Sequence, residues 1–180
     1  MKFVQPIRDE KKIEEMKNLL KKQNYRNYFL FVFGINTGLR ISDMLKLKVA
    51  DVKDKTHITI KEDKTEKIKR FKINSALQYE ITKYISNMND NEYLFYSNRT
   101  GKPIGRLMAW KLLNNAAEKA GINEIGTHTL RKTFGYHFYQ RKKDVALLQN
   151  IFNHSSPSQT LRYIGINQDI IDEAIDDFNL

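Results

Sequence analysis

One segment, Tyr25 to Gly38, constrains the fold of this chain more than any other. It is apolar on nearly every side, and a helix without a polar face must be covered by neighbouring elements. Gly38 follows as a stop signal, because glycine adopts the left-handed backbone that ends many helices. The longest apolar run, Tyr28 to Phe33, is far too short to cross a bilayer, which needs about 20 residues. We therefore predict a helix buried inside a single globular domain.

Further segments predict that most of the chain is helical. Ser75 is expected to cap one of these helices, because a serine hydroxyl can accept from the free N–H groups of a first turn. Helical periodicity, capping or stop signals mark residues 9–22, 41–47, 75–87, 105–120, 129–141, 144–152, 158–164 and 167–178.

Alternating apolar residues predict a small antiparallel sheet. Residues 56–60 and 71–73 alternate, and the polar residues 62–66 between them suit a hairpin turn. Residues 93–95 are interpreted as a third short strand. The predicted fold is α+β, mostly α-helical, with one small three-stranded antiparallel sheet.

The charge indicates a polyanionic partner. The formal net charge is +10, yet residues 165–180 contain five acids and no lysine or arginine. That segment is therefore −5, and the rest of the chain is +15. Such a concentration of positive charge is what a surface facing double-stranded DNA requires. The chain has no cysteine, which excludes disulfides and thiolate metal sites and favours a cytoplasmic protein.

Four short motifs contain candidate functional residues, and each has an ordinary structural explanation when taken alone. An arginine after a helix stop can cap carbonyls, a histidine at a helix end can be a satisfied polar group, and the chain has nine tyrosines. The motifs are Thr37-Gly38-Leu39-Arg40, His128-Thr129-Leu130-Arg131, Phe152-Asn153-His154 and Thr160-Leu161-Arg162-Tyr163.

In their order and spacing, these motifs together resemble the tyrosine recombinase (phage integrase) family over about residues 9–164. The resemblance implies a DNA breaking-rejoining catalytic domain over residues 1–165. It implies a site-specific recombinase, or integrase, that cleaves and rejoins DNA through a 3′-phosphotyrosine formed by Tyr163. Family members usually have glycine where Asn153 stands, and asparagine is the next most tolerated residue in a left-handed turn.

The chemistry of phosphodiester cleavage explains why these residue types are needed. Arg40 and Arg131 can clamp the phosphate, since a guanidinium binds two oxygens in a fixed geometry, and His154 is a further donor. His128 is the candidate base for the phenol of Tyr163, whose ionisation at pH 7 would otherwise cost about 4 kcal/mol. With the charge supplied by arginines, we expect no metal, no ATP and no other cofactor.

By the same resemblance, a lysine of the hairpin protonates the leaving 5′-oxygen. Lys64 is the choice, and Lys67 is the alternative. The other basic residues of the hairpin are expected to contact the DNA backbone or to be solvated. The expected DNA-binding set is Lys61, Lys67, Lys69, Arg70 and Lys72.

Two expectations concern assembly. Fewer than 40 residues precede Arg40, too few for the DNA-clamping domain that family members usually have there, so an accessory protein or a neighbouring protomer is expected to supply that function. The acidic, amphipathic segment 166–180 is expected to dock on a neighbouring protomer, with folding back onto its own domain as the alternative.

Three alternative functions agree less well with the sequence. A type IB topoisomerase would use similar residues to relax supercoils, and a catalytically weak or accessory module would only bind DNA. The amino-acid sequences of the Arg40 and Arg131 motifs favour the integrase. The complete set of candidate side chains argues against a degenerate module. A metal hydrolase is disfavoured because the four histidines form no ligand motif.

Overall fold

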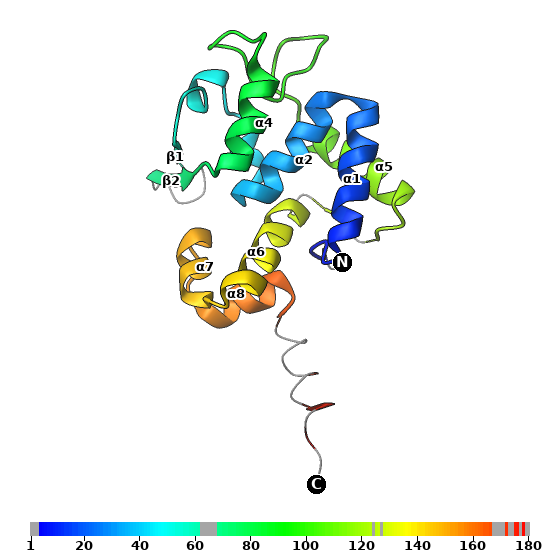
Figure 1. The fold of residues 1–180 in the computed structure, drawn as a ribbon, viewed down its shortest axis with the longest axis vertical. Helices are drawn as coiled ribbons and strands as arrows, with labels where there is room; N and C mark the ends of the chain where they lie inside the picture. Colours follow the sequence, from blue (N-terminus) through cyan, green and yellow to red (C-terminus); the bar gives the residue numbers. More distant parts are fainter. Residues whose placement is uncertain are drawn as a thin grey trace.

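Two groups of helices make up the molecule (Figure 1). The computed structural model describes residues 4–61, 68–123, 125–126, 128–166, 172, 175–176 and 178. The N-terminal group contains α1 (Glu10–Gln23), α2 (Tyr25–Thr37), α3 (Ile41–Met44), the strands β1 (His57–Lys61) and β2 (Ile68–Lys72), α4 (Ser75–Ile85) and α5 (Arg106–Lys119). The C-terminal group contains α6 (Thr129–Lys142), α7 (Val145–Phe152) and α8 (Pro157–Ile164).

The apolar helix α2 lies at the centre, as its sequence predicts. It packs against α1, α4 and α6, and its side chains Phe29, Phe31 and Phe33 are all fully buried. The helix ends at Gly38, which adopts the left-handed conformation with φ of 64°. A Cβ at this position would also collide with the ring of Phe134 on α6, so glycine is needed both for the turn and for the close approach.

The sheet has two strands among the described residues, so the prediction of a third strand is wrong. β1 and β2 pair antiparallel from His57 opposite Lys72 to Lys61 opposite Ile68. The segment 93–95 forms no ladder, but Tyr93 makes an isolated antiparallel bridge with Lys48. Leu94 N–H donates to Leu47 O, and Phe95 O accepts from Ile104 N–H. Its apolar pattern reflects burial in the core between two loops. The predicted turn, residues 62–66, lies outside the described residues.

Two helix boundaries also differ from the prediction. Asn74, one residue before Ser75, caps α4 by accepting from Leu77 N–H at 2.8 Å. The helix expected over 41–47 ends at Met44. Of the helix expected over 167–178, most residues lie outside the described part of the chain.

Within the C-terminal group, α7 and α8 pack closely against α6 at a glycine. A Cβ on Gly135 would lie 2.7 Å from atoms of both Phe152 and Ile164, so α7 and α8 can approach α6 only because this position has no side chain. Phe152 and Ile164 belong to a small buried cluster with Leu148 and Ile166. In the described part of the chain, no helix is long and apolar enough to cross a membrane.

Candidate functional site

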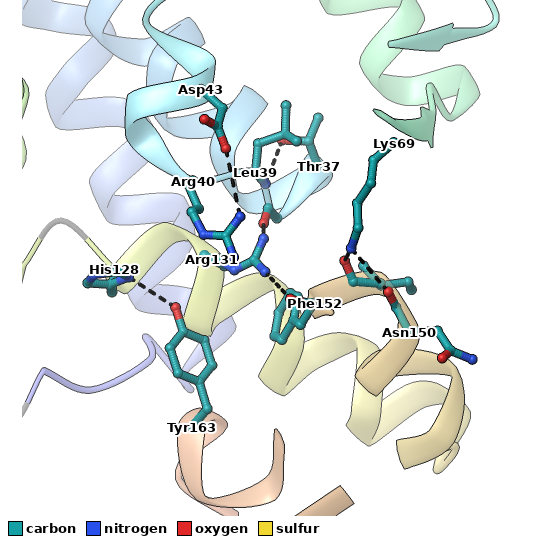
Figure 2. Close-up of polar contacts among 12 residues, drawn as sticks. Thr37, Leu39, Arg40, Asp43, Lys69, His128, Arg131, Asn150, Phe152 and Tyr163 are labelled. Atoms are coloured by element: carbon teal, nitrogen blue, oxygen red, sulfur yellow. Dashed lines mark hydrogen bonds and ion pairs between the residues drawn. The ribbon is translucent and has the colours of Figure 1, made fainter. Parts of the chain in front are cut away.

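The sequence-predicted catalytic residues that the structure describes meet at the boundary between the two groups, where Figure 2 shows Arg40, His128, Arg131 and Tyr163. Arg40 comes from the N-terminal group, immediately after α2 ends. His128 and Arg131 stand at the start of α6, His154 follows α7, and Tyr163 lies near the end of α8. Residues that are far apart in sequence therefore share one location.

Arg131 is buried and joins three segments. Its guanidinium donates to Gly38 O at 2.6 Å and to Phe152 O at 2.9 Å. These two carbonyls lie at the C-terminal ends of α2 and α7, respectively. The same group stacks over the Phe152 ring, 4.2 Å from its centroid. These contacts fix the guanidinium plane, which is the preorganisation that bidentate phosphate binding requires.

Arg40 lies close to an acidic side chain. It is half-buried, and its guanidinium lies 4.0 Å from a carboxylate oxygen of Asp43 one turn later in α3. Asp43 is itself buried, with 6 % of its surface exposed. The carboxylate can therefore orient Arg40 from the protein side, while Figure 2 shows the guanidinium lying beside Arg131.

The Tyr163 hydroxyl points at the His128 ring (Figure 2), with 3.2 Å between its oxygen and Nδ1. In the tautomer that leaves Nδ1 unprotonated, the phenol donates to this nitrogen, which is the geometry of a general base. The Tyr163 ring is also in edge contact with the rings of Phe152 and His154, at centroid distances of 5.6 and 5.1 Å. These aromatic contacts limit the directions in which the hydroxyl can point.

Two opposing effects act on the pKa of Tyr163. Burial raises this pKa, because the phenolate loses hydration. The positive charges of Arg131 and Arg40, together with a hydrogen bond from Arg131, lower it and offset part of that rise. The arginines that could bind a phosphate therefore also favour the ionised form of Tyr163.

His154 is neutral at physiological pH. Burial, assisted by the positive charges of Arg131, Arg40 and Lys69, lowers the pKa of His154 to about 4. Its Nδ1 lies 3.1 Å from the hydroxyl of Thr160. The preceding Asn153 adopts the left-handed conformation with φ of 55°, as predicted for the residue that replaces glycine here.

The basic residues of the hairpin divide into two kinds. Lys61, Arg70 and Lys72 are exposed, whereas Lys69 reaches across to the end of α7 and donates to Asn150 O at 3.2 Å and Ile151 O at 3.1 Å (Figure 2). A cation at the C-terminal end of a helix is favourable because the last carbonyls are negative there. The predicted catalytic residue Lys64 and its alternative Lys67 lie outside the described residues.

Two residues next to the site were not predicted from the sequence. One is Asp43, although its position one turn after Arg40 is a usable signal. The other is Lys132, whose ammonium lies 5.1 Å from the centroid of the Tyr163 ring. No sequence pattern shows that a lysine will face an aromatic ring from another helix. Among the described residues, no group of three or more histidines and acids is placed to hold a metal ion.

Comparison with known proteins agrees with this geometry. A sequence model of the phage integrase family matches residues 8–169. The chain is 57 % identical, over 94 % of its length and 93 % of the relative, to a probable integrase/recombinase, YoeC, of Bacillus subtilis. It is 27 % identical to the tyrosine recombinase XerA of Pyrococcus furiosus, covering 95 % of this chain but 61 % of XerA.

Solved structures show the same fold. A XerA recombinase superposes with a TM-score of 0.76 at 21 % identity, covering 100 % of this chain and 66 % of that one. The XerH recombinase bound to its difH substrate after cleavage superposes with a TM-score of 0.73 at 21 % identity, covering 96 % and 53 %. The fold and these likenesses define a tyrosine-type site-specific recombinase catalytic domain. The chain belongs to the phage integrase family.

Proposed function

We propose that this chain performs the DNA cleavage and rejoining steps of site-specific recombination, with Tyr163 as the nucleophile. The observation that supports this most is the 3.2 Å contact between the Tyr163 hydroxyl and His128 Nδ1, within reach of two arginines. A phenol, a base and a pair of guanidinium groups are the parts that transfer of a phosphodiester to tyrosine requires.

The proposed reaction has two reversible transfers. Arg40 and Arg131 bind the non-bridging oxygens of one DNA phosphate, and His128 takes the proton of Tyr163 as its oxygen attacks phosphorus. The bond to the 5′-oxygen breaks, that oxygen receives a proton, and the 3′-phosphate remains on the tyrosine. A 5′-hydroxyl of a second DNA end then attacks the phosphotyrosine and releases the enzyme. The ester conserves the bond energy between the two steps.

Two further side chains have proposed roles in this reaction. Neutral His154 would donate a hydrogen bond to the phosphate through Nε2, which requires the Thr160 hydroxyl to turn from Ser156 O and donate to His154 Nδ1. Lys64 is the proposed acid that protonates the 5′-oxygen, with Lys67 as the alternative. This assignment comes from family resemblance alone. It predicts that Lys64→Ala slows cleavage of a phosphodiester whose leaving group is the normal 5′-oxygen, because that oxygen needs a proton.

We also propose that the hairpin follows the DNA backbone. Lys61, Arg70 and Lys72 are exposed on β1 and β2, and such side chains supply affinity that depends on salt rather than on base sequence. Lys67 joins this set by its place in the sequence. Lys69 would contribute only after leaving the α7 carbonyls that it binds in this structure.

We further propose that the chain assembles on DNA through its C-terminal segment. Ile175 and Phe178 are exposed within this acidic segment, 65 % and 67 % respectively, which suits docking on a second copy. An accessory protein is the other proposed source of additional DNA contacts. Because the substrate is DNA, we expect the enzyme to act in the cytoplasm.

A covalent-adduct assay tests the central assignment even though the target sequence is not defined. The protein is incubated in EDTA with a pool of nicked duplexes carrying a randomised core, and DNA that remains attached after SDS is sequenced. We expect wild-type protein to select a site and to form the adduct, and Tyr163→Phe to form none. An adduct that survives this substitution, or an adduct on another residue, would refute the assignment. Relaxation of a supercoiled plasmid without site preference would indicate a topoisomerase, and binding without any adduct would indicate an accessory module.

A further inference from the structure

The N-terminal segment, residues 4–8, lies against α6 and forms several hydrogen bonds with it. Ile7 N–H donates to the Thr133 hydroxyl at 2.9 Å, and His137 Nε2 lies 2.9 Å from Ile7 O. At the start of the segment, the Lys132 ammonium donates to Val4 O at 2.7 Å. The segment is therefore fixed to the turn of α6 that directly follows Arg131.

The same segment reaches the end of the helix that bears Tyr163. The Arg8 guanidinium donates to Gly165 O at 2.8 Å, and Gly165 is the left-handed residue that ends α8. The guanidinium also lies over the ring of Tyr136 on α6, 5.2 Å from its centroid. Residues 4–8 thus connect the first turn of α6 to the last turn of α8.

Lys132 lies between this segment and Tyr163. Its side chain is buried, with 7 % of the residue exposed, and its ammonium lies on the face of the Tyr163 ring, 5.1 Å from the centroid. Burial lowers the pKa of Lys132, so its charge is held with little hydration. A cation over an aromatic ring is attracted by the negative face of the ring, and the attraction is stronger where water is excluded.

We infer that Lys132 is a positioning residue for Tyr163, and that the N-terminal segment holds Lys132 in that role. The inference rests on the proposed function, because it requires Tyr163 to be the nucleophile. The ammonium is fixed on one side by Val4 O and faces the Tyr163 ring on the other, so it limits the tilt of the ring. Arg8 limits the movement of the helix end at Gly165.

Ionisation of the nucleophile strengthens the same contact. A phenolate ring is more negative than a phenol ring, so the Lys132 ammonium attracts the attacking form of Tyr163 more than the resting form. An interaction that grows along the reaction accelerates the chemical step instead of improving substrate binding. Lys132 should therefore affect the cleavage rate and its pH dependence, and leave DNA affinity nearly unchanged.

The test is Lys132→Met, which keeps the length and apolar stem of the side chain and removes its charge. DNA affinity and the single-turnover rate of adduct formation are measured separately on the nicked duplex that wild-type protein selects. We expect affinity within about twofold of wild type and a rate about five- to thirtyfold lower. The rise of rate with pH should move to higher pH, because the phenolate has lost a neighbouring cation. Lys132→Arg, which restores the charge, should move this profile back toward that of wild type.

Lys12→Met is the matched control. Lys12 also donates to a backbone carbonyl, Ala120 O at 2.6 Å, so this variant loses a similar lysine–carbonyl bond on α1, away from Tyr163. We expect its cleavage rate to equal that of wild type. If Lys132→Met cleaves like Lys12→Met, or loses affinity with an unchanged pH profile, the inference is wrong and Lys132 is a structural or phosphate-binding residue.

A second variant keeps the inference testable if Lys132→Met does not fold. Arg8→Gln leaves Lys132 intact and removes the guanidinium that contacts Gly165 O and the Tyr136 ring, and it should also lower the rate at constant affinity. If Arg8→Gln cleaves at the wild-type rate, the N-terminal segment has no role in positioning Tyr163. Failure of wild-type protein itself to form any adduct would instead count against the proposed function.

Discussion

The two groups of helices differ in how they are held together. The core of the N-terminal group is extensive and includes fully buried Phe29, Phe33 and Phe95 in mutual ring contact. The separate cluster of the C-terminal group contains four buried apolar residues, Leu148, Phe152, Ile164 and Ile166, surrounded by partly buried aromatic side chains. Polar contacts from Arg131 and from residues 4–8 supplement this small cluster.

This difference suggests a division of roles. The large core gives a rigid platform that presents Arg40 and the hairpin, whereas the small cluster presents Tyr163 on a helix with little apolar burial of its own. Elements with few buried apolar contacts open at lower free energy than the rest of a protein. We therefore expect Tyr163, the proposed nucleophile, to lie on the part of the molecule that opens at the lower free energy.

The largest effect is expected from Arg131, which joins the two groups. Arg131→Ala should reduce adduct formation about 10²- to 10³-fold, because a preorganised charge is lost at the phosphate. It should also lower the free energy of unfolding by about 3 kcal/mol, since the carbonyls of Gly38 and Phe152 lose charged donors. Single-turnover cleavage and urea denaturation measure the two effects.

Arg40→Ala is the control for this comparison. We expect a similar loss of cleavage, and we combine the change with Asp43→Asn, because Arg40→Ala alone would leave the buried Asp43 carboxylate without this cation. The double variant should lose less unfolding free energy than Arg131→Ala, since the carbonyls of Gly38 and Phe152 keep their charged donors. Equal destabilisation would contradict the view that the bonds of Arg131 to these carbonyls stabilise the boundary between the groups.

The next largest effect is expected when a buried ring is removed from the core of the N-terminal group or from the cluster of the C-terminal group. Phe152→Ala and Phe95→Ala each remove a fully buried ring and should each cost about 3–5 kcal/mol of stability. We expect native-state hydrogen exchange to show that Phe152→Ala selectively loosens α6 to α8, whereas Phe95→Ala lowers protection throughout. In wild type, α8 should exchange faster than α2. Uniform protection of both helices would show that the molecule opens as one unit and would remove the proposed difference between the groups.

The smallest expected effect is the pH dependence of stability that His154 causes at the boundary between the two groups. Because the folded pKa of His154 is about 4, below its ordinary value of 6.5, the unfolded chain binds a proton more readily than the native one between these values. The stability contributed by neutral His154 is complete above about pH 6.5 and is lost as the pH falls toward 4. Thermal melting of wild type and His154→Gln should therefore converge at low pH. His57→Gln on β1 provides the control, and identical pH profiles for wild type and His154→Gln would contradict the assignment.

The sequence predicted most helices because their signals are local. The apolar run of α2 and the stop at Gly38 depend only on neighbouring residues, and both were confirmed. The prediction of a third strand was wrong because residues 93–95 make only an isolated bridge, and their apolar pattern reflects the burial of Leu94 and Phe95. Ser75 has a side chain that suits a cap, but the adjacent Asn74 makes the bond, a choice that backbone geometry decides.

The candidate site shows the same limit. The spacing of Arg40, Arg131 and Tyr163 was enough to suggest their association through family resemblance. Nothing in that spacing predicted that Arg131 would bind the carbonyls of Gly38 and Phe152. Contacts of this kind depend on how helices pack, which is a property of the whole core.

The sequence by itself determined the family, the chemical types of the site residues and most of the helices, because each depends on residue identity and short-range order. Only the tertiary structure decided that Lys132 faces the Tyr163 ring and that residues 4–8 connect α6 to the end of α8. Those contacts join residues about 30 to 160 positions apart in the chain. Their formation depends on close helix approach, such as that allowed by Gly135, which no local pattern specifies.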